Sequence, residues 1–157
     1  MSTFGFGGAK GAESEIDEST PFVAASDGDL TLLQQALVKL NVPPGVKDDN
    51  GLTPLHNAVS YNQAEIIRWL LGQNVNVNAQ DSDGDTPLHH CDNVEAARIL
   101  IQEGNADYKI QNNEGKTALQ LKEEEFKDAA DDMDEGESDN EDTENLDKLI
   151  GYLKSLP

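Results

Sequence analysis

The chain has 157 residues, of which 36% are hydrophobic and 5% aromatic, so it predicts one domain with a mostly aliphatic core. Its net charge of −20 disfavours direct binding to nucleic acids or anionic membranes, which needs clustered Lys and Arg, but permits basic protein partners. One cysteine excludes an intramolecular disulfide, and we find neither a signal-peptide core in residues 1–20 nor a run of about 18 apolar residues.

The N-terminal segment, residues 1–19, is predicted to be a disordered tail. Its run GFGGAKG (5–11) is rich in glycine, but no strand pattern precedes it and it lacks the G-K-[ST] ending of a phosphate-binding loop. We therefore interpret it as a flexible tail and not as a nucleotide site. The apolar residues of LTLLQQALVKL (30–40) then recur at helical spacing.

Internal repetition is the strongest pattern in the sequence. The stretch GLTPLHNA begins at Gly51, GDTPLHHC begins 33 residues later at Gly84, and GKTALQLK begins 31 residues after that at Gly115. The segments 64–72 and 94–104 lie between these markers and have apolar residues at helical spacing. Each unit therefore predicts helical structure after a glycine-containing turn.

The residue types of the repeated motif suit a turn that leads into a helix. Gly51 and Gly84 supply the backbone conformation that other residues avoid. Threonine can cap the helix, proline suits its first position, and leucine is expected to be buried in the stack. The residues concerned are Thr53, Pro54 and Leu55, then Thr86, Pro87 and Leu88, and finally Leu119.

T-P-L-H recurring with a period near 33 resembles the ankyrin repeat, which consists of a β-turn and two antiparallel helices. The resemblance implies an all-α solenoid of about four helix-turn-helix repeats with hairpin fingers. The repeats are expected at 20–50, 51–83, 84–114 and from 115 onward. In that family the histidine bonds the backbone of the adjacent turn, so His56 and His89 are expected to hold repeats in register. The chain also resembles small fungal single-domain ankyrin proteins, which implies no activity.

Two repeats depart from the pattern. The third is 31 residues long because about three residues are missing after Cys91, between its helices, while EGNADY (103–108) gains one. We therefore expect its first helix to be short. The first repeat has Phe22 and Val23 where the pattern has Leu-His, as terminal repeats often differ because they cap the stack.

The C-terminal third is strongly acidic. Residues 115–126 are predicted to form the first helix of the fourth repeat, and 146–157 to form a capping helix. Residues 123–145 contain thirteen acids and one lysine, a net charge of −12. We interpret 127–145 as a disordered acidic insertion between these helices; a plain acidic tail with a loose terminal helix is the alternative. Ser138 lies in an acidic context that resembles casein kinase 2 phosphorylation sites.

The stretch DSDGDTPLHHCDN (81–93) is dense in metal-ligand residue types. However, consecutive His-His-Cys residues on one helix cannot all face one ion, and a zinc site needs about four ligands. In an EF-hand calcium loop glycine is sixth and glutamate twelfth, whereas Gly84 is fourth here and Asp92 twelfth. We therefore predict no metal site, no cofactor and no catalytic residues, so the chain is not expected to be an enzyme. A His-Cys metal site remains the rival from that class.

Proteins of the ankyrin family typically bind partners with the hairpin tips and the inner face of the first helices. Carried onto this chain, the resemblance implies binding positions in three fingers and at the end of one helix. They are Asp49, Asn50 and Leu52, then Ser60 and Tyr61, then Ser82, Asp83 and Asp85, and finally Asn113, Glu114 and Lys116. Leu52 and Tyr61 are the expected apolar anchors, because such side chains carry most interface energy. The alternative is that these residues are simply solvated turns.

The function predicted from these features is a non-enzymatic protein-protein interaction module. We expect an acidic adaptor or escort chaperone for a basic protein client. The alternative is an assembly or regulatory subunit of a larger complex, of the proteasome or kinase type, bound through the concave face. We expect a monomer in the cytoplasm and leave a nuclear location open.

Overall fold

The computed structural model describes residues 15–131 and 141–157. Most of the expected N-terminal tail, residues 1–14, and Ser138 lie outside these ranges. Within them the chain is entirely helical between its turns and contains no strand. The α-helices are α1 (Thr20–Asp27), α2 (Leu30–Leu40), α3 (Pro54–Ser60), α4 (Ala64–Gly72), α5 (Val94–Arg98), α6 (Ala118–Asp131) and α7 (Glu141–Lys154), with a 3-10 helix η2 (Pro87–His90) and a π-helix η3 (Ile99–Glu103).

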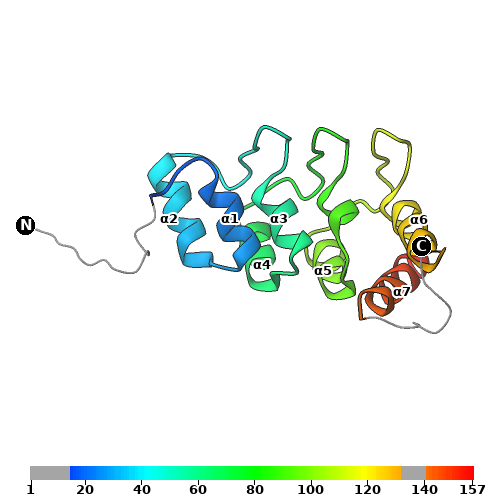
Figure 1. Cartoon of the computed structure of the whole chain (residues 1–157). Helices are drawn as coiled ribbons and strands as arrows, with labels where there is room; N and C mark the ends of the chain where they lie inside the picture. Colours follow the sequence, from blue (N-terminus) through cyan, green and yellow to red (C-terminus); the bar gives the residue numbers. More distant parts are fainter. Residues whose placement is uncertain (1–14, 132–140) are drawn as a thin grey trace, which may run out of the picture.

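Helix pairs stand side by side in a row, and three loops project from one edge like fingers (Figure 1). Helices α1, α3, η2 and α6 pack in sequence to form an inner row. In the outer row, α4 packs on α5 and η3, and α5 packs on α7. The prediction of an all-α solenoid of about four helix-turn-helix repeats is confirmed. None of the helices in the described ranges has the length and apolarity that crossing a bilayer requires.

Each finger is closed by the side chain of its first residue. In the first finger, Asp48 Oδ1 accepts the backbone N–H groups of Asn50 and Leu52 at 2.8 and 2.9 Å. Asp81 does the same in the second finger and Asn112 in the third, 33 and 31 residues further on. A glycine with φ between 75° and 78° completes the turn in each finger, as only glycine takes this conformation without strain.

The threonine that opens α3 forms a capping box with a histidine. His56 Nδ1 accepts the N–H of Thr53 at 3.1 Å, and the Thr53 hydroxyl faces the N–H of His56. The same exchange joins Thr86 and His89 at the start of η2. These contacts satisfy backbone donors that a helix start leaves without a partner.

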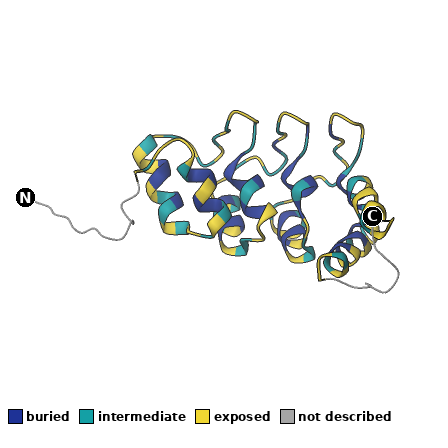
Figure 2. Cartoon of the chain, viewed as in Figure 1, coloured by how far each residue is buried: buried dark blue, intermediate teal, exposed yellow. Residues whose placement is uncertain are grey.

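The core runs along the stack between the two helix rows (Figure 2). Leu55 and Leu88 are buried as the repeat pattern predicts, and the core continues through Ile67 and Leu100 to Leu149 of α7. Leu119 takes the equivalent position in the last repeat but is only half-buried. No further repeat stacks on this part of the described chain, so one side of Leu119 stays uncovered.

The third repeat has the short first helix that the missing residues predict. Helix η2 has four residues, whereas α3, its equivalent in the second repeat, has seven. Cys91 ends η2 and is fully buried, and Asn93 caps α5 by accepting the N–H of Glu95 at 2.8 Å. The chain therefore passes from the inner to the outer row about one helical turn early.

The helices extend further into the acidic stretch than we predicted. Helix α6 continues to Asp131 and α7 begins at Glu141, so a disordered insertion over 127–145 is wrong at both ends. The acidic residues here are good helix formers, and carboxylates in the first turn of α7 favour its N-terminus. Helix α7 packs against α5 and α6 and buries Leu146, Leu149 and Leu153, the arrangement of a second helix in a fourth repeat.

Candidate functional site

Two histidines join the inner helices to the next finger along the stack. His56 Nε2 lies 3.0 Å from the carbonyl oxygen of Asp85, and His89 Nε2 lies 2.9 Å from that of Lys116. Because Nδ1 of each ring accepts the threonine N–H, the proton lies on Nε2, which donates to the carbonyl. These are the register contacts that the resemblance implied. Burial lowers the pKa of His56, although its hydrogen bond to Asp85 opposes this.

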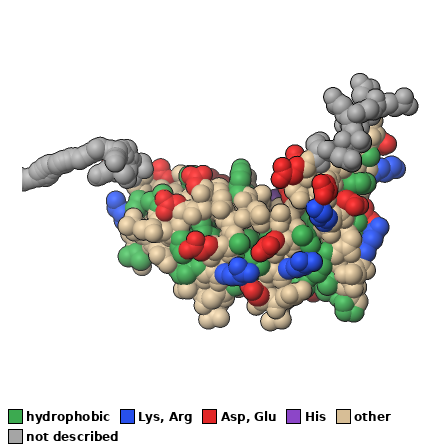
Figure 3. All heavy atoms as spheres, turned by 90° about the horizontal axis from the view of Figure 1, so that it is seen from below, with side chains coloured by type: hydrophobic (Ala, Val, Ile, Leu, Met, Phe, Trp, Pro, Cys, Tyr) green, Lys and Arg blue, Asp and Glu red, His purple; other side chains and the backbone are tan. Residues whose placement is uncertain are grey.

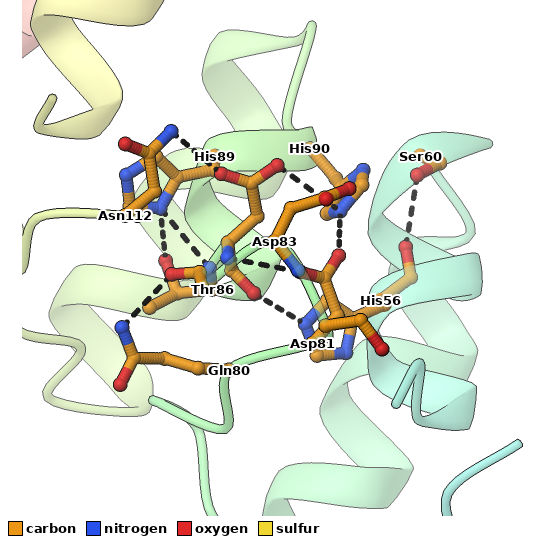
Figure 4. Close-up of polar contacts among 12 residues, drawn as sticks. His56, Ser60, Gln80, Asp81, Asp83, Thr86, His89, His90 and Asn112 are labelled. Atoms are coloured by element: carbon orange, nitrogen blue, oxygen red, sulfur yellow. Dashed lines mark hydrogen bonds and ion pairs between the residues drawn. The ribbon is translucent and has the colours of Figure 1, made fainter. Parts of the chain in front are cut away.

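His90 has turned away from His89 and faces the second finger (Figure 4). Its Nε2 lies 2.8 Å from Asp81 Oδ2, and its ring stands edge-on to that of His56 with 5.4 Å between the centroids. Burial acts to raise the pKa of Asp81, but the hydrogen bonds from His90 and from the turn N–H groups outweigh it and lower the pKa. His90 thus braces the second finger at the point where η2 is short.

The side chains of His56, Asp81 and His90 place three potential ligand atoms within 4.8 Å of one another. Both nitrogens of His56 are engaged, however, as is Asp81 Oδ1, which holds the turn. The ligands left in this cluster are fewer than the about four that a zinc site needs. Cys91 faces elsewhere: its thiol donates to the carbonyl of Asn93, and burial raises its pKa to about 12, so it is not a poised thiolate.

The three fingers form a continuous rim because each is hydrogen-bonded to the next. Ser82 N donates to the Asn50 carbonyl at 2.8 Å, and Asn113 N donates to the Asp83 carbonyl at 2.9 Å. The predicted binding residues on this rim are exposed at six positions and half-buried at three. Asp49, Asn50, Ser82, Asp83, Asn113 and Glu114 are exposed, whereas Leu52, Asp85 and Lys116 are half-buried.

The half-buried positions correct our expectation that Asp85 lies on an exposed hairpin. One carboxylate oxygen of Asp85 accepts Asn112 Nδ2 of the third finger at 2.9 Å, so this side chain joins two fingers. Lys116 forms an ion pair with Glu124 of α6. Both residues therefore stabilise the rim, and carboxylates such as Asp49 and Asp83 are the groups that it presents to solvent.

Tyr61 ends α3 and stands at a hollow of about 640 Å³. Its side chain is 64% exposed, one of the few large hydrophobic side chains on the described surface. Val59, Ser60, Asn62, Asn93, Asn145 and Leu146 line the hollow together with Tyr61 and with three carboxylates, those of Asp92, Glu141 and Asp142. The hollow occupies the space beside Asp92 where a longer first helix would continue in the third repeat.

Viewed from the side opposite the fingers, the molecule has a notch in one edge with acidic side chains beside it (Figure 3). Of the acids at the hollow, Asp92 is also an ion-pair partner of Lys122. The Lys122 ammonium is 3% exposed and lies 2.9 Å from both Asp92 and Glu125. Burial acts to lower the pKa of Lys122, but these carboxylates outweigh it and raise the pKa. Lys122 therefore fixes the short linker to α6.

Sequence reasoning identified Ser60 and Tyr61 but missed the acids opposite them. Asp92 could have been found from the gap after Cys91, which draws the linker toward the end of α3. Glu141 and Asp142 had been assigned to a disordered insertion, so the pattern of the sequence carried no signal for them. Ser60 itself is exposed, but its hydroxyl donates to the His56 carbonyl at 3.0 Å within the helix.

Comparison with known proteins agrees with the repeat geometry. The family model of ankyrin repeats (3 copies) matches residues 22–112. The ankyrin repeat-containing protein P1E11.10 of Schizosaccharomyces pombe is 38% identical over 108 residues, which cover 68% of this chain and 52% of that protein. The RelA-associated inhibitor of Mus musculus is 32% identical over 100 residues, which cover 62% of this chain and 12% of the inhibitor. The chain thus spans about half the length of the first relative and a small part of the second.

Proposed function

The chain belongs to the ankyrin-repeat family, whose repeats are protein-interaction modules, and on that premise we propose that it is a non-enzymatic adaptor or escort chaperone for a basic protein. The client would present Lys and Arg side chains to the concave side of the stack. Escort by a polyanion would keep such a segment from other anionic ligands until it is delivered.

The hollow beside Tyr61 carries this proposal. An exposed aromatic ring at the edge of a cavity lined by three carboxylates suits a Lys or Arg side chain. The cation can lie against the ring face while its donors reach the carboxylates. Asp92 is already paired with Lys122, so Glu141 and Asp142 are the acids available to a client.

The fingers add a second acidic surface along the same stack. Asp49 and Asp83 are exposed on neighbouring fingers, and no Lys or Arg in the described residues forms an ion pair with either. Such charges raise the association rate and favour a basic partner, while adding little affinity each. The client is therefore expected to be held at the hollow and guided by the rim.

Binding of a fluorescein-labelled basic heptapeptide, KRKLKRK, tests the proposal by fluorescence anisotropy. We expect binding that weakens by about tenfold or more between 50 and 500 mM salt, and no binding of the acidic counterpart EDELEDE. If neither peptide binds, or if both bind equally well and independently of salt, a basic client is excluded.

A pair of matched double variants locates the site. Glu141→Gln with Asp142→Asn, or Tyr61→Ala alone, should weaken binding about fivefold. The control is Glu65→Gln with Glu95→Gln, which removes the same charge from first turns of other outer helices, α4 and α5. Equal losses in the acidic pair and its control would mean that net charge, and not the hollow, binds the client.

One comparison favours a second candidate function. The mouse relative is named an inhibitor, which is compatible with a regulatory subunit that binds a larger protein through the concave face. That function predicts that replacing the acids of residues 132–140 with serine leaves binding intact, while Leu52→Ala and Tyr61→Ala abolish it. The adaptor function predicts weaker, salt-sensitive binding after the first change.

A further inference from the structure

A second hollow, of about 680 Å³, lies between α1, α3 and the first finger. Its apolar walls come from Pro21, Phe22, Val23, Leu40, Val42 and Val46. Val23 is 50% exposed there. This volume is within the range of protein pockets that take a side chain or a small molecule.

The hollow exists because the first repeat lacks the register histidine. Val23 stands three residues after Thr20, as His56 stands three residues after Thr53. The Asp85 carbonyl of the second finger accepts both the N–H of Asp81 and His56 Nε2. Leu52 is the equivalent residue of the first finger, and its carbonyl accepts the N–H of Asp48, but valine has no donor to add. No side chain of Val23 therefore bridges α1 to the first finger.

One buried polar atom beside the hollow also lacks a partner. Asn57 lines the hollow, and its Nδ2 donates to the hydroxyl of Ser26 at 3.2 Å. Its Oδ1 is buried and has no hydrogen-bond donor among the described residues. A buried acceptor without a donor is unfavourable, so an occupant that brings an N–H group close to Asn57 would gain affinity.

The charges around the hollow are mostly negative. Glu18, Asp48 and Asp49 lie at its rim together with a single cation, Lys47. The Lys47 ammonium donates to the Gln80 carbonyl at 3.2 Å, so it is directed toward the second finger. The rim therefore complements an occupant that carries positive charge next to an apolar group.

We propose that this hollow takes one aliphatic side chain of the client's basic segment, with its flanking Lys or Arg residues at the acidic rim. The proposal rests on the proposed function, because it assumes a basic protein client, and it adds an apolar anchor in the first repeat. The client motif is then an apolar residue within a basic run and not basic charge alone.

Two peptides of equal charge test the anchor: KRKLKRK and KRKSKRK. Burial of one leucine side chain should make the first bind about tenfold more tightly to the full chain in an anisotropy titration. Val23→Arg should bring the two affinities to within about twofold of each other. The matched control is Val38→Arg, which adds the same charge at a valine of α2 that is 81% exposed and does not line this hollow.

A second variant separates loss of the hollow from loss of the fold. Val23→His would place the missing donor opposite the Leu52 carbonyl and fill the hollow. We expect it to lower the preference for the leucine peptide without lowering the melting temperature.

The possible results distinguish the two proposals. If wild-type protein binds both peptides equally and Glu141→Gln with Asp142→Asn weakens both, the anchor is wrong and the basic client stands. Equal leucine preference in Val23→Arg and Val38→Arg also overturns the anchor. If neither peptide binds, both proposals are wrong.

Discussion

Replacing His56 tests how much one register histidine stabilises the stack. The side chain is 1% exposed and makes two hydrogen bonds, one with the N–H of Thr53 and one with the carbonyl of Asp85. His56→Ala removes both, at about 1 kcal/mol each, and leaves the Thr53 N–H buried without an acceptor, at about 1–3 kcal/mol more. We expect a loss of about 3–5 kcal/mol in the free energy of unfolding, measured by urea denaturation.

His56→Gln separates the cap from the bridge. In the fourth repeat Gln120 stands at the equivalent position, and its side-chain oxygen accepts the N–H of Thr117 at 2.9 Å. Glutamine at position 56 can keep the cap in this way but loses the bridge to Asp85. We expect it to cost about 1–2 kcal/mol. Equal losses for His56→Gln and His56→Ala would refute the assignment of a separate capping contribution.

The same variants give the sign of the pH dependence. The pKa of His56 is lowered in the folded protein from its ordinary value of 6.5, so below pH 6.5 the unfolded chain binds the proton first. The contribution of His56 to stability is therefore complete above pH 6.5 and is lost as pH falls toward the folded pKa. In His56→Gln this part of the pH dependence should disappear, and its persistence would show that another group causes it.

Three further outcomes can be measured on the purified protein. Gly84→Ala should destabilise by at least about 1 kcal/mol more than Gly115→Ala in urea, because a Cβ at Gly84 would meet Asn113 N at 2.7 Å whereas nothing lies within 4 Å at Gly115. The thiol of Cys91 should react with a disulfide reagent only at the rate of unfolding, and fast labelling in buffer would contradict its burial. Lys122→Ala should cost about 2–3 kcal/mol by the same denaturation assay and Lys122→Met clearly less, because methionine keeps the buried packing; equal costs would make the ion pairs the main contribution.

The fold could be predicted because each repeat states its own structure locally. Thr53 and Thr86 cap, the following prolines fit the first turn, and the finger glycines need left-handed backbone, so spacing alone gave the stack. The acidic helices could not be predicted in the same way. Their apolar contacts are few: Phe126 packs against the core from α6, which is otherwise polar, and a high charge was interpreted as disorder.

The candidate site could be predicted only where it belongs to one repeat. Tyr61 follows from the repeat alignment, because it ends a first helix. Its partners at the hollow come from the shortened linker and from α7, more than 30 residues away, so only the packed stack brings them together. The hollow beside Val23 is the converse case: the departure from Leu-His was visible, but its consequence depends on the finger that the histidine would have joined.

Both hollows arise where the chain departs from its repeat, which gives a physical reason to place recognition there. In a regular repeat the histidine and a full first helix fill the space between helices and fingers, so the surface is closed by contacts that stabilise the stack. Removing about one turn after Cys91 opens one space, and valine at position 23 opens the other. Each departure forgoes a stabilising contact and leaves acids beside apolar surface. Retaining both is consistent with surfaces used to bind a partner and not with surfaces optimised for the stability of the stack alone.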